Sequence, residues 1–270
     1  MKAAAFFHGP PRIHAMAEAF RIGCMRHGIP CDTLRVGKRT DADVIWLYGL
    51  GPALPAFEMH PQAIRLVGDK GYFDEYLKKP KYLRVSVNAQ QPDKHLRRVR
   101  HSVDRFNALG IKFSPTTRRG DYILLCGIGP KQCVRHGLQY GQWERETYRK
   151  LKAATDRPIF CREKPGNRQI EGIPRLSDIR PSAAIRGAWA VVCMTGNIGA
   201  DSILEGVPVI AEGGPGSVYY RHRLQDIDDI NPLPQDLALQ ALADIAYWQW
   251  TLDEIRSGDL WANLRNEGFF

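Results

Sequence analysis

The strongest constraint on the fold is the stretch of residues 188–214, AWAVVCMTGNIGADSILEGVPVIAEGG, in which short apolar and glycine-containing segments alternate. Residues 188–194 form an unbroken apolar run, which is typical of a strand buried on both faces of a parallel sheet. Residues 199–204 suffice only for a short helix closed by a glycine, and residues 207–211 predict a second strand. The stretch therefore predicts a βαβ unit in an α/β protein.

The polar turn of this unit, between its first strand and its helix, consists of Thr195, Gly196 and Asn197. Such a turn lies at the carboxyl end of a strand, where open α/β sheets bind ligands, and the first amides of the following helix carry a partial positive charge. Phosphate is the ligand that this arrangement favours. An ordinary βαβ repeat, with glycines chosen for packing, is an equally open interpretation.

The order TGNIGADSILEGVPVI resembles the donor-nucleotide segment of the GT-B glycosyltransferases, in which a small polar turn leads into a short helix bearing an acid and then into Gly-x-Pro-Val-Ile. The resemblance implies that Asp201, five residues before Gly206, holds the ribose hydroxyls of a nucleotide sugar and that the turn amides hold its diphosphate. Aspartate stands here where the family has glutamate. The segments GPGSVYYRHRLQDI and AYWQWTLDEIRSG are similar to the tails of capsule-type and phage-type members.

The resemblance implies an α/β fold that is GT-B-like, with two Rossmann-like domains whose parallel sheets face a cleft. Two similar decapeptides, DVIWLYGLGP and DYILLCGIGP, each run from a strand into a tight turn, and the second follows a basic, turn-rich segment at residues 114–120. We therefore predict an acceptor-side domain over residues 1–118 and a nucleotide-sugar-binding domain over residues 119–270. A closing helix is expected over residues 237–255, and in GT-B proteins such a helix commonly crosses back to the first domain.

The charge of the chain favours a polyanionic partner or an anionic substrate, since 38 Lys and Arg against 29 Asp and Glu give a formal net charge of +9. The six cysteines form no CxxC pair and most lie in apolar runs. This usage is typical of reduced thiols in a cytoplasmic protein, in the host cytoplasm if a phage encodes it. No apolar stretch approaches the length of a transmembrane helix, so we expect no membrane span.

Most of the positive charge lies in one window, residues 81–120, which holds ten basic residues against two acidic ones. Several of them fall at helical spacing and predict one helix face that follows a phosphate backbone. A solvated helix face is an equally common use of such a run. The predicted nucleic-acid contacts are Lys94, Arg97, Arg98, Arg100, His101 and Arg105.

Sugar transfer needs a base that takes the proton of the acceptor hydroxyl. The resemblance implies that this base comes from the N-terminal domain. Asp69, expected just after a strand at residues 64–67, is the first candidate, and His8, at the end of the first strand, is the second. The common alternatives are a turn-forming role for an aspartate near glycine and simple exposure for a lone histidine in a loop.

Further donor contacts are predicted in the second domain. Arg162 and Lys164, in CREKP, occupy the place where capsule-type relatives carry a basic residue, so the resemblance implies that they add charge at the diphosphate. Surface ion pairing explains both residues equally well. Gly127 and Gly129 predict a turn that lets the donor and acceptor halves approach closely.

Two short Asp-x-Asp patterns, at residues 41–43 and 226–228, match the metal-binding motif of the other large glycosyltransferase fold. So short a pattern arises readily by chance, and GT-B enzymes generally place no required metal there. We therefore predict no metal site.

The predicted function is transfer of a sugar, glucose from UDP-glucose, to a hydroxymethylated pyrimidine in double-stranded DNA, as the resemblance to phage DNA-glucosylating enzymes implies. Base flipping would bring the base hydroxyl into the cleft, at a cost on the order of a few kcal/mol. One alternative is a capsule or lipopolysaccharide-type glycosyltransferase, in which the basic window meets an anionic glycan or membrane phosphate. A second is a non-catalytic nucleic-acid-binding protein on a GT-B scaffold. The sugar, the base, the stereochemical outcome and the oligomeric state stay open.

Overall fold

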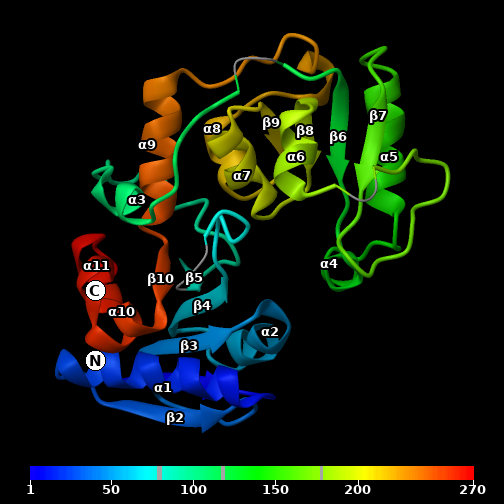
Figure 1. Cartoon of the computed structure of the whole chain (residues 1–270). Coiled ribbons are helices and arrows are strands. Elements are labelled where there is room, and N and C mark those ends of the chain that lie inside the picture. The colour runs from blue at the N-terminus through cyan, green and yellow to red at the C-terminus, as the bar shows by residue number, and fades with distance from the viewer. Residues whose placement is uncertain (78–80, 117–118, 177–178) are drawn as a thin grey trace. The chain divides into compact units, whose positions relative to one another are not determined.

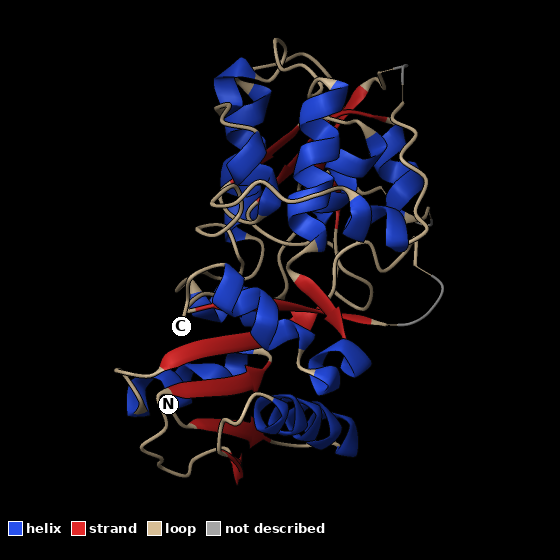
Figure 2. Ribbon diagram, turned by 90° about the vertical axis from the view of Figure 1, so that its left-hand side faces the viewer, coloured by secondary structure: helices blue, strands red, loops and turns tan. Residues whose placement is uncertain are grey.

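The structure of the protein is a computed structural model that describes residues 1–77, 81–116, 119–176 and 179–270. The chain forms two compact units, one of residues 1–99 with 246–270 and one of residues 100–245. Each unit is built on its own sheet (Figure 1). Figure 2, turned by 90° from that view, shows the strands in red among the helices, in blue, that pack on them.

The first unit has a six-stranded mixed sheet in the order β10-β5-β4-β3-β1-β2. The neighbours from β4 to β2 are parallel, whereas β5 is antiparallel to both β4 and β10. The strands are β1 (Ala3–Phe7), β2 (Cys31–Arg35), β3 (Val44–Tyr48), β4 (Ile64–Lys70), β5 (Tyr82–Val87) and β10 (Gln249–Thr251), and the helices are α1 (Pro11–Arg26), α2 (Leu50–Met59), α10 (Leu252–Ser257) and α11 (Asp259–Asn266).

The central strand β3 is buried on both faces, since residues 44–47 are all fully buried and alternate side chains of a strand point to opposite faces. On β3, Ile45 and Leu47 pack in one apolar cluster with Ala56 of α2. Trp46 points the other way and stacks on Phe20 of α1 at a ring-centroid distance of 5.1 Å. The apolar run of β3 is therefore continuous, as expected for a strand covered on both sides.

Residues 246–270 complete the first unit. Strand β10 pairs with β5, and Figure 1 shows α10 and α11, in red, beside α1, in blue. A Cβ atom on Gly23 of α1 would lie 2.2 Å from the carbonyl oxygen of Ile255, so α1 and α10 approach each other closely. The His27 ring also donates a hydrogen bond to the Gly258 carbonyl at 2.8 Å.

The second unit has a four-stranded sheet in the order β7-β6-β8-β9, and all its pairs are parallel. The middle of β6 is fully buried, as expected for a strand with neighbours on both edges and cover on both faces. The strands are β6 (Tyr122–Cys126), β7 (Ile159–Arg162), β8 (Ala188–Cys193) and β9 (Val209–Ala211), and the helices are α3 (Asp104–Ala108), α4 (Pro130–Arg135), α5 (Gln142–Lys152), α6 (Pro181–Arg186), α7 (Ile198–Glu205), α8 (Pro215–Tyr219) and α9 (Gln235–Ala246), with a 3-10 turn η1 (Leu224–Asp226).

The predicted βαβ unit is confirmed as β8, α7 and β9. Gly206 ends α7 with φ of 71°, in the left-handed region that favours glycine. A Cβ atom there would also lie 2.5 Å from Pro115 Cβ. The helix predicted over residues 237–255 is confirmed over residues 237–246 and wrong beyond them, because α9 ends at Ala246 and the chain then forms β10 before α10 begins.

The division into units differs from the predicted domains of residues 1–118 and 119–270. The predicted boundary lies outside the described residues, and residues 100–116, placed in the first domain, belong to the second unit. Arg100 bonds Gln240, the His101 ring bonds Asp244, and the Thr116 amide donates to the Glu205 carbonyl. These contacts within the second unit account for the difference.

Candidate functional site

Four turns meet at the carboxyl edge of the second sheet, because all four of its strands are parallel. The last residues of the strands are register partners, with Cys126 beside both Arg162 and Cys193, and Cys193 beside Ala211. Chain segments that follow these residues leave from the same edge, where open α/β sheets bind ligands. The four carboxyl-edge turns are residues 127–129, 163–164, 195–197 and 212–214.

The predicted donor residues of the second domain lie at this edge. The Gly127 amide donates to the Arg162 carbonyl at 3.0 Å, and the Lys164 side chain lies 3.9 Å from the Cβ position of Gly129. The turns after β6 and β7 are therefore in contact, and the Lys164 side chain lies beside Gly129.

The turns after β8 and β9 are also in contact. The Gly213 amide donates to the Met194 carbonyl at 2.8 Å, and the Cβ position of Gly214 lies 3.3 Å from the Gly196 carbonyl oxygen. Gly196 has φ of 134°, which favours glycine, and no described atom lies within 4 Å of its Cβ position. The backbone of the turn at residues 195–197 thus borders open space that a ligand can enter.

Asp201 lies in the first turn of α7, the helix that Asn197 precedes as N-cap. Burial raises the pKa of the Cys126 thiol, and the neighbouring Cys193 and Asp201 add to the rise, while Arg162 acts against it. The first turn of α7 directly follows the turn at residues 195–197, so Asp201 belongs to the same edge of the sheet. An acid in the first helical turn, beside open turn backbone, is suited to accept hydrogen bonds from hydroxyl groups of a ligand.

Three residues of this region were missed by sequence reasoning. The Trp143 indole donates a hydrogen bond to Glu212 Oε1 at 2.6 Å, and the buried Glu144 Oε1 accepts one from the Ile128 amide at 2.7 Å. Trp143 and Glu144 begin α5, and Glu212 lies in the turn after β9. Glu144 shares the buried face of α5 with Thr147 and Leu151, and this helical spacing was the available signal.

Burial raises the pKa of the Glu144 carboxyl, and the nearby Glu163 adds to the rise, while the Ile128 amide and Arg145 act against it. Folding therefore favours protonation of Glu144 relative to the unfolded chain, and the stability this gives is complete below the ordinary pKa of glutamate and is lost as pH rises through the raised value. We expect Glu144→Gln to gain unfolding free energy relative to the unmodified chain as pH rises through that window. Urea unfolding across a pH series checks this, and parallel curves would contradict it.

The two predicted base candidates lie at the carboxyl edge of the first sheet, on either side of Tyr48. The His8 Nε2 donates to the Tyr48 carbonyl at 3.1 Å, a tautomer that leaves Nδ1 as a proton acceptor. Asp69 lies within β4, which runs to Lys70, and not after a strand as predicted. Its Oδ2 accepts from Arg84 Nη2 at 3.0 Å, and its Oδ1 from the Lys70 amide at 2.7 Å.

The helix face predicted for the basic window is wrong, because residues 94–100 form turns and the nearest helix is α3. Arg97 has φ of 70°, which no α-helix contains. His101 is buried, and its ring bonds Asp244 at 3.2 Å, so this side chain is not presented to a phosphate backbone. Lys94, Arg97 and Arg98 belong to the first unit and Arg100 and Arg105 to the second. Arg118, another basic residue of the window, lies outside the described residues.

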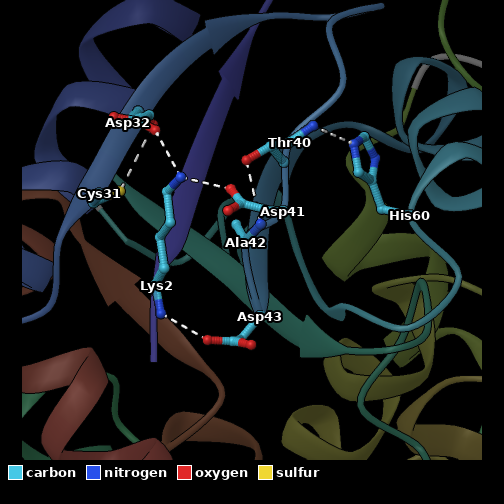
Figure 3. A network of polar contacts seen from close by, with 8 residues as sticks. All are labelled: Lys2, Cys31, Asp32, Thr40, Asp41, Ala42, Asp43 and His60. Atoms are coloured by element: carbon cyan, nitrogen blue, oxygen red, sulfur yellow. Dashed lines mark hydrogen bonds and ion pairs between the residues drawn. The ribbon is translucent and has the colours of Figure 1, made fainter.

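The Asp-x-Asp pattern at residues 41–43 bonds protein cations. Figure 3 shows Lys2 between Asp32, Asp41 and Asp43, with its ammonium bonded to Asp41 and its amide donating to Asp43 Oδ2 at 2.7 Å. The pattern at residues 226–228 is used similarly, since Asp228 Oδ1 accepts from Arg157 at 2.9 Å. Within the described ranges no group of three or more His, Cys, Asp or Glu side chains is placed to hold a metal ion.

Comparisons with known proteins relate the chain to solved structures, whereas no family model and no curated protein sequence matches it. KpsC of Thermosulfurimonas dismutans, described as a beta Kdo 2,7 transferase, is similar with a TM-score of 0.54 and 12% identity, over 96% of this chain and 99% of that one. KpsC described as a beta Kdo 2,4 transferase is similar with a TM-score of 0.51 and 14% identity, over 90% of each chain. These likenesses confirm the predicted α/β, GT-B-like fold with two Rossmann-like domains.

Proposed function

We propose that this protein is a nucleotide-sugar-dependent glycosyltransferase that acts on a saccharide acceptor, as capsule or lipopolysaccharide-type enzymes do. The observation that carries the proposal is the meeting of the predicted donor residues at one open carboxyl edge of the second sheet. The fold supports it, because the two similar structures are described as Kdo transferases.

The carboxyl edge carries groups suited to each part of a nucleotide sugar. Backbone amides around Gly196 are suited to the phosphates, and Arg162 and Lys164 supply positive charge that stabilises the departing phosphate group. Asp201 accepts hydrogen bonds from the ribose hydroxyls. The exposed carboxylate of Glu212, oriented by Trp143, lies next to the same turn and is a second acceptor.

For the proton acceptor we propose His8 in place of Asp69. Both oxygens of Asp69 already accept hydrogen bonds, one of them from a buried arginine, so neither oxygen is without a protein partner. His8 keeps Nδ1 without a hydrogen-bond partner among the described residues. When the acceptor oxygen bonds to the anomeric carbon and the nucleotide leaves with its bonding electrons, the hydroxyl proton passes to Nδ1.

A saccharide acceptor fits the observations better than DNA does. Kdo is an acidic sugar, so basic residues suit donors and acceptors of this kind as well as they suit nucleic acid. The helix expected to follow a DNA backbone is absent, and His101 is buried. Transfer to hydroxymethylated DNA keeps only the resemblance in sequence as support.

The test is mass spectrometry after incubation of the full chain with UDP-hexoses and CMP-Kdo as donors. A Kdo-terminated oligosaccharide and a 5-hydroxymethylcytosine duplex serve as acceptors. We expect a mass increase of one sugar residue on the oligosaccharide. Transfer to the duplex alone would restore the DNA hypothesis. If the chain bound none of the nucleotides, the proposal of a glycosyltransferase would be rejected.

Asp201→Asn is expected to raise the donor KM about 30-fold, because replacing a charged acceptor of ribose hydrogen bonds costs about 2 kcal/mol. Initial rates against donor concentration measure this change. Asp229→Asn, an exposed substitution in the same unit, is the control. An unchanged donor KM in Asp201→Asn would remove the ribose assignment.

A further inference from the structure

The first turn of α5 is bonded to two of the four carboxyl-edge turns. Trp143 bonds Glu212 in the turn after β9, and the next residue, Glu144, bonds the Ile128 amide in the turn after β6. Strand β8 lies between β6 and β9 in the sheet. Two consecutive residues of one helix therefore hold the turns on either side of the turn at residues 195–197.

Both side chains are built into the unit. Trp143 is 7% exposed and Glu144 is fully buried. The Cβ position of Gly127 lies 3.2 Å from Glu144 Oε1, so a glycine there lets the carboxyl group reach the turn. The second oxygen, Glu144 Oε2, is buried and has no hydrogen-bond partner among the described residues. A buried carboxyl group that holds a turn through one oxygen is more than packing requires, since an apolar side chain would fill the same space.

We propose that Trp143 and Glu144 are positioning residues, which set the shape of the nucleotide-sugar site by holding the turns after β9 and β6. The inference rests on the proposed function, because it assigns these residues to the site that binds the nucleotide. Neither residue is given a contact with the sugar or a part in the chemistry.

The geometry explains why loss of the bond between Glu144 and the Ile128 amide would weaken nucleotide binding. The Ile128 side chain is buried, and without Glu144 its amide needs another acceptor, which a shift of the turn would have to supply. The Gly127 amide bonds the Arg162 carbonyl and Gly129 lies against the Lys164 side chain, so the shift also disturbs the segment that carries the two predicted phosphate contacts. A displacement of about 1 Å at a site can reduce its activity on the order of 100-fold.

The experiment compares four variants of the full chain. Glu144→Ala removes the acceptor of the Ile128 amide, whereas Glu144→Gln keeps an oxygen for it. Trp143→Phe removes the bond to Glu212. Thr147→Val is the matched control, because Thr147 is buried on the same face of α5 and bonds no carboxyl-edge turn.

Two readouts are measured, amide hydrogen exchange and calorimetric affinity for UDP and CMP. We expect Glu144→Ala to speed amide exchange at residues 127–129 and to weaken nucleotide binding at least 10-fold. We expect Trp143→Phe to speed amide exchange at residues 212–214 and to weaken nucleotide binding by a similar factor. Glu144→Gln should bind within about threefold of the unmodified chain, since the amide side chain keeps an oxygen that can accept from the Ile128 amide. Thr147→Val should leave both readouts unchanged.

The outcomes separate this inference from the proposed function. If the unmodified chain binds neither nucleotide, the proposed function fails and the positioning role falls with it. If the unmodified chain binds nucleotide and Glu144→Ala speeds exchange without loss of affinity, Glu144 is structural and the inference alone is overturned. Equal loss of affinity in Glu144→Gln and Glu144→Ala would also overturn it, because the retained oxygen would then have no effect.

Discussion

Replacing His8 by alanine is expected to lower kcat about 1000-fold, because general base catalysis contributes about two to four orders of magnitude to such a reaction. Asp69→Asn is expected to lower kcat less than about tenfold. In that variant the Arg84 partner can still bond the remaining oxygen, and no proton acceptor is lost. Steady-state rates with the acceptor identified by mass spectrometry provide both values.

Two further measurements test the assignment of His8. Imidazole added to His8→Ala should restore part of the rate, since a diffusible base can replace the missing ring. His136→Ala, which removes an exposed histidine of the second unit, serves as the control and should keep the full rate. If Asp69→Asn were the more damaging substitution and imidazole had no effect, the base would be Asp69, as the sequence first suggested.

Gly23→Ala is expected to destabilise the first unit by about 3 kcal/mol or more. The added methyl group would lie 2.2 Å from the Ile255 carbonyl oxygen, a backbone atom that cannot turn aside. Relief requires α1 and α10 to separate, and overpacking of this kind costs about 1–3 kcal/mol even where side chains can adjust. A fall in Tm of about 6–12 °C follows for a protein of this size.

Gly51→Ala is the matched control for Gly23→Ala. Gly51 also belongs to a helix of the first unit, has no positive φ, and has no described atom within 4 Å of its Cβ position. Thermal unfolding of both variants, followed by circular dichroism, should show a loss only in Gly23→Ala. Equal Tm values for the two would mean that α1 and α10 do not approach as closely as described.

The parts of the fold that sequence predicted are those with a local signal. Buried parallel strands such as β6 and β8 are continuous apolar runs, and Gly206 marks the end of α7. The prediction of one continuous closing helix failed because the interaction that interrupts the helix, the pairing of β10 with β5, joins segments distant in the chain. Trp248 is buried and Trp250 pairs with Leu83 of β5, which overrides the helical tendency of the alanine-rich segment before them.

The candidate site divides in the same way. Residues that directly follow a strand, such as Thr195 and Lys164, are predictable because every parallel strand delivers its next residues to one edge. Trp143 and Glu144 belong to a helix, and their bonds to two turns exist only after the sheet has assembled. The number of basic residues in the window can be read from the sequence, but their arrangement in space cannot. His101, for example, bonds the buried Asp244, which is distant in the chain.

The return of residues 246–270 to the first unit has a consequence for synthesis on the ribosome. Strand β5 leaves the ribosome long before its partner β10, so its outer edge stays without that partner while the whole of the second unit is being made. An unpaired strand edge is a template for joining another chain. Residues 1–99 of the nascent protein therefore wait for residues 246–270, which have not yet been translated. We expect the need for chaperones to be greatest during this stage.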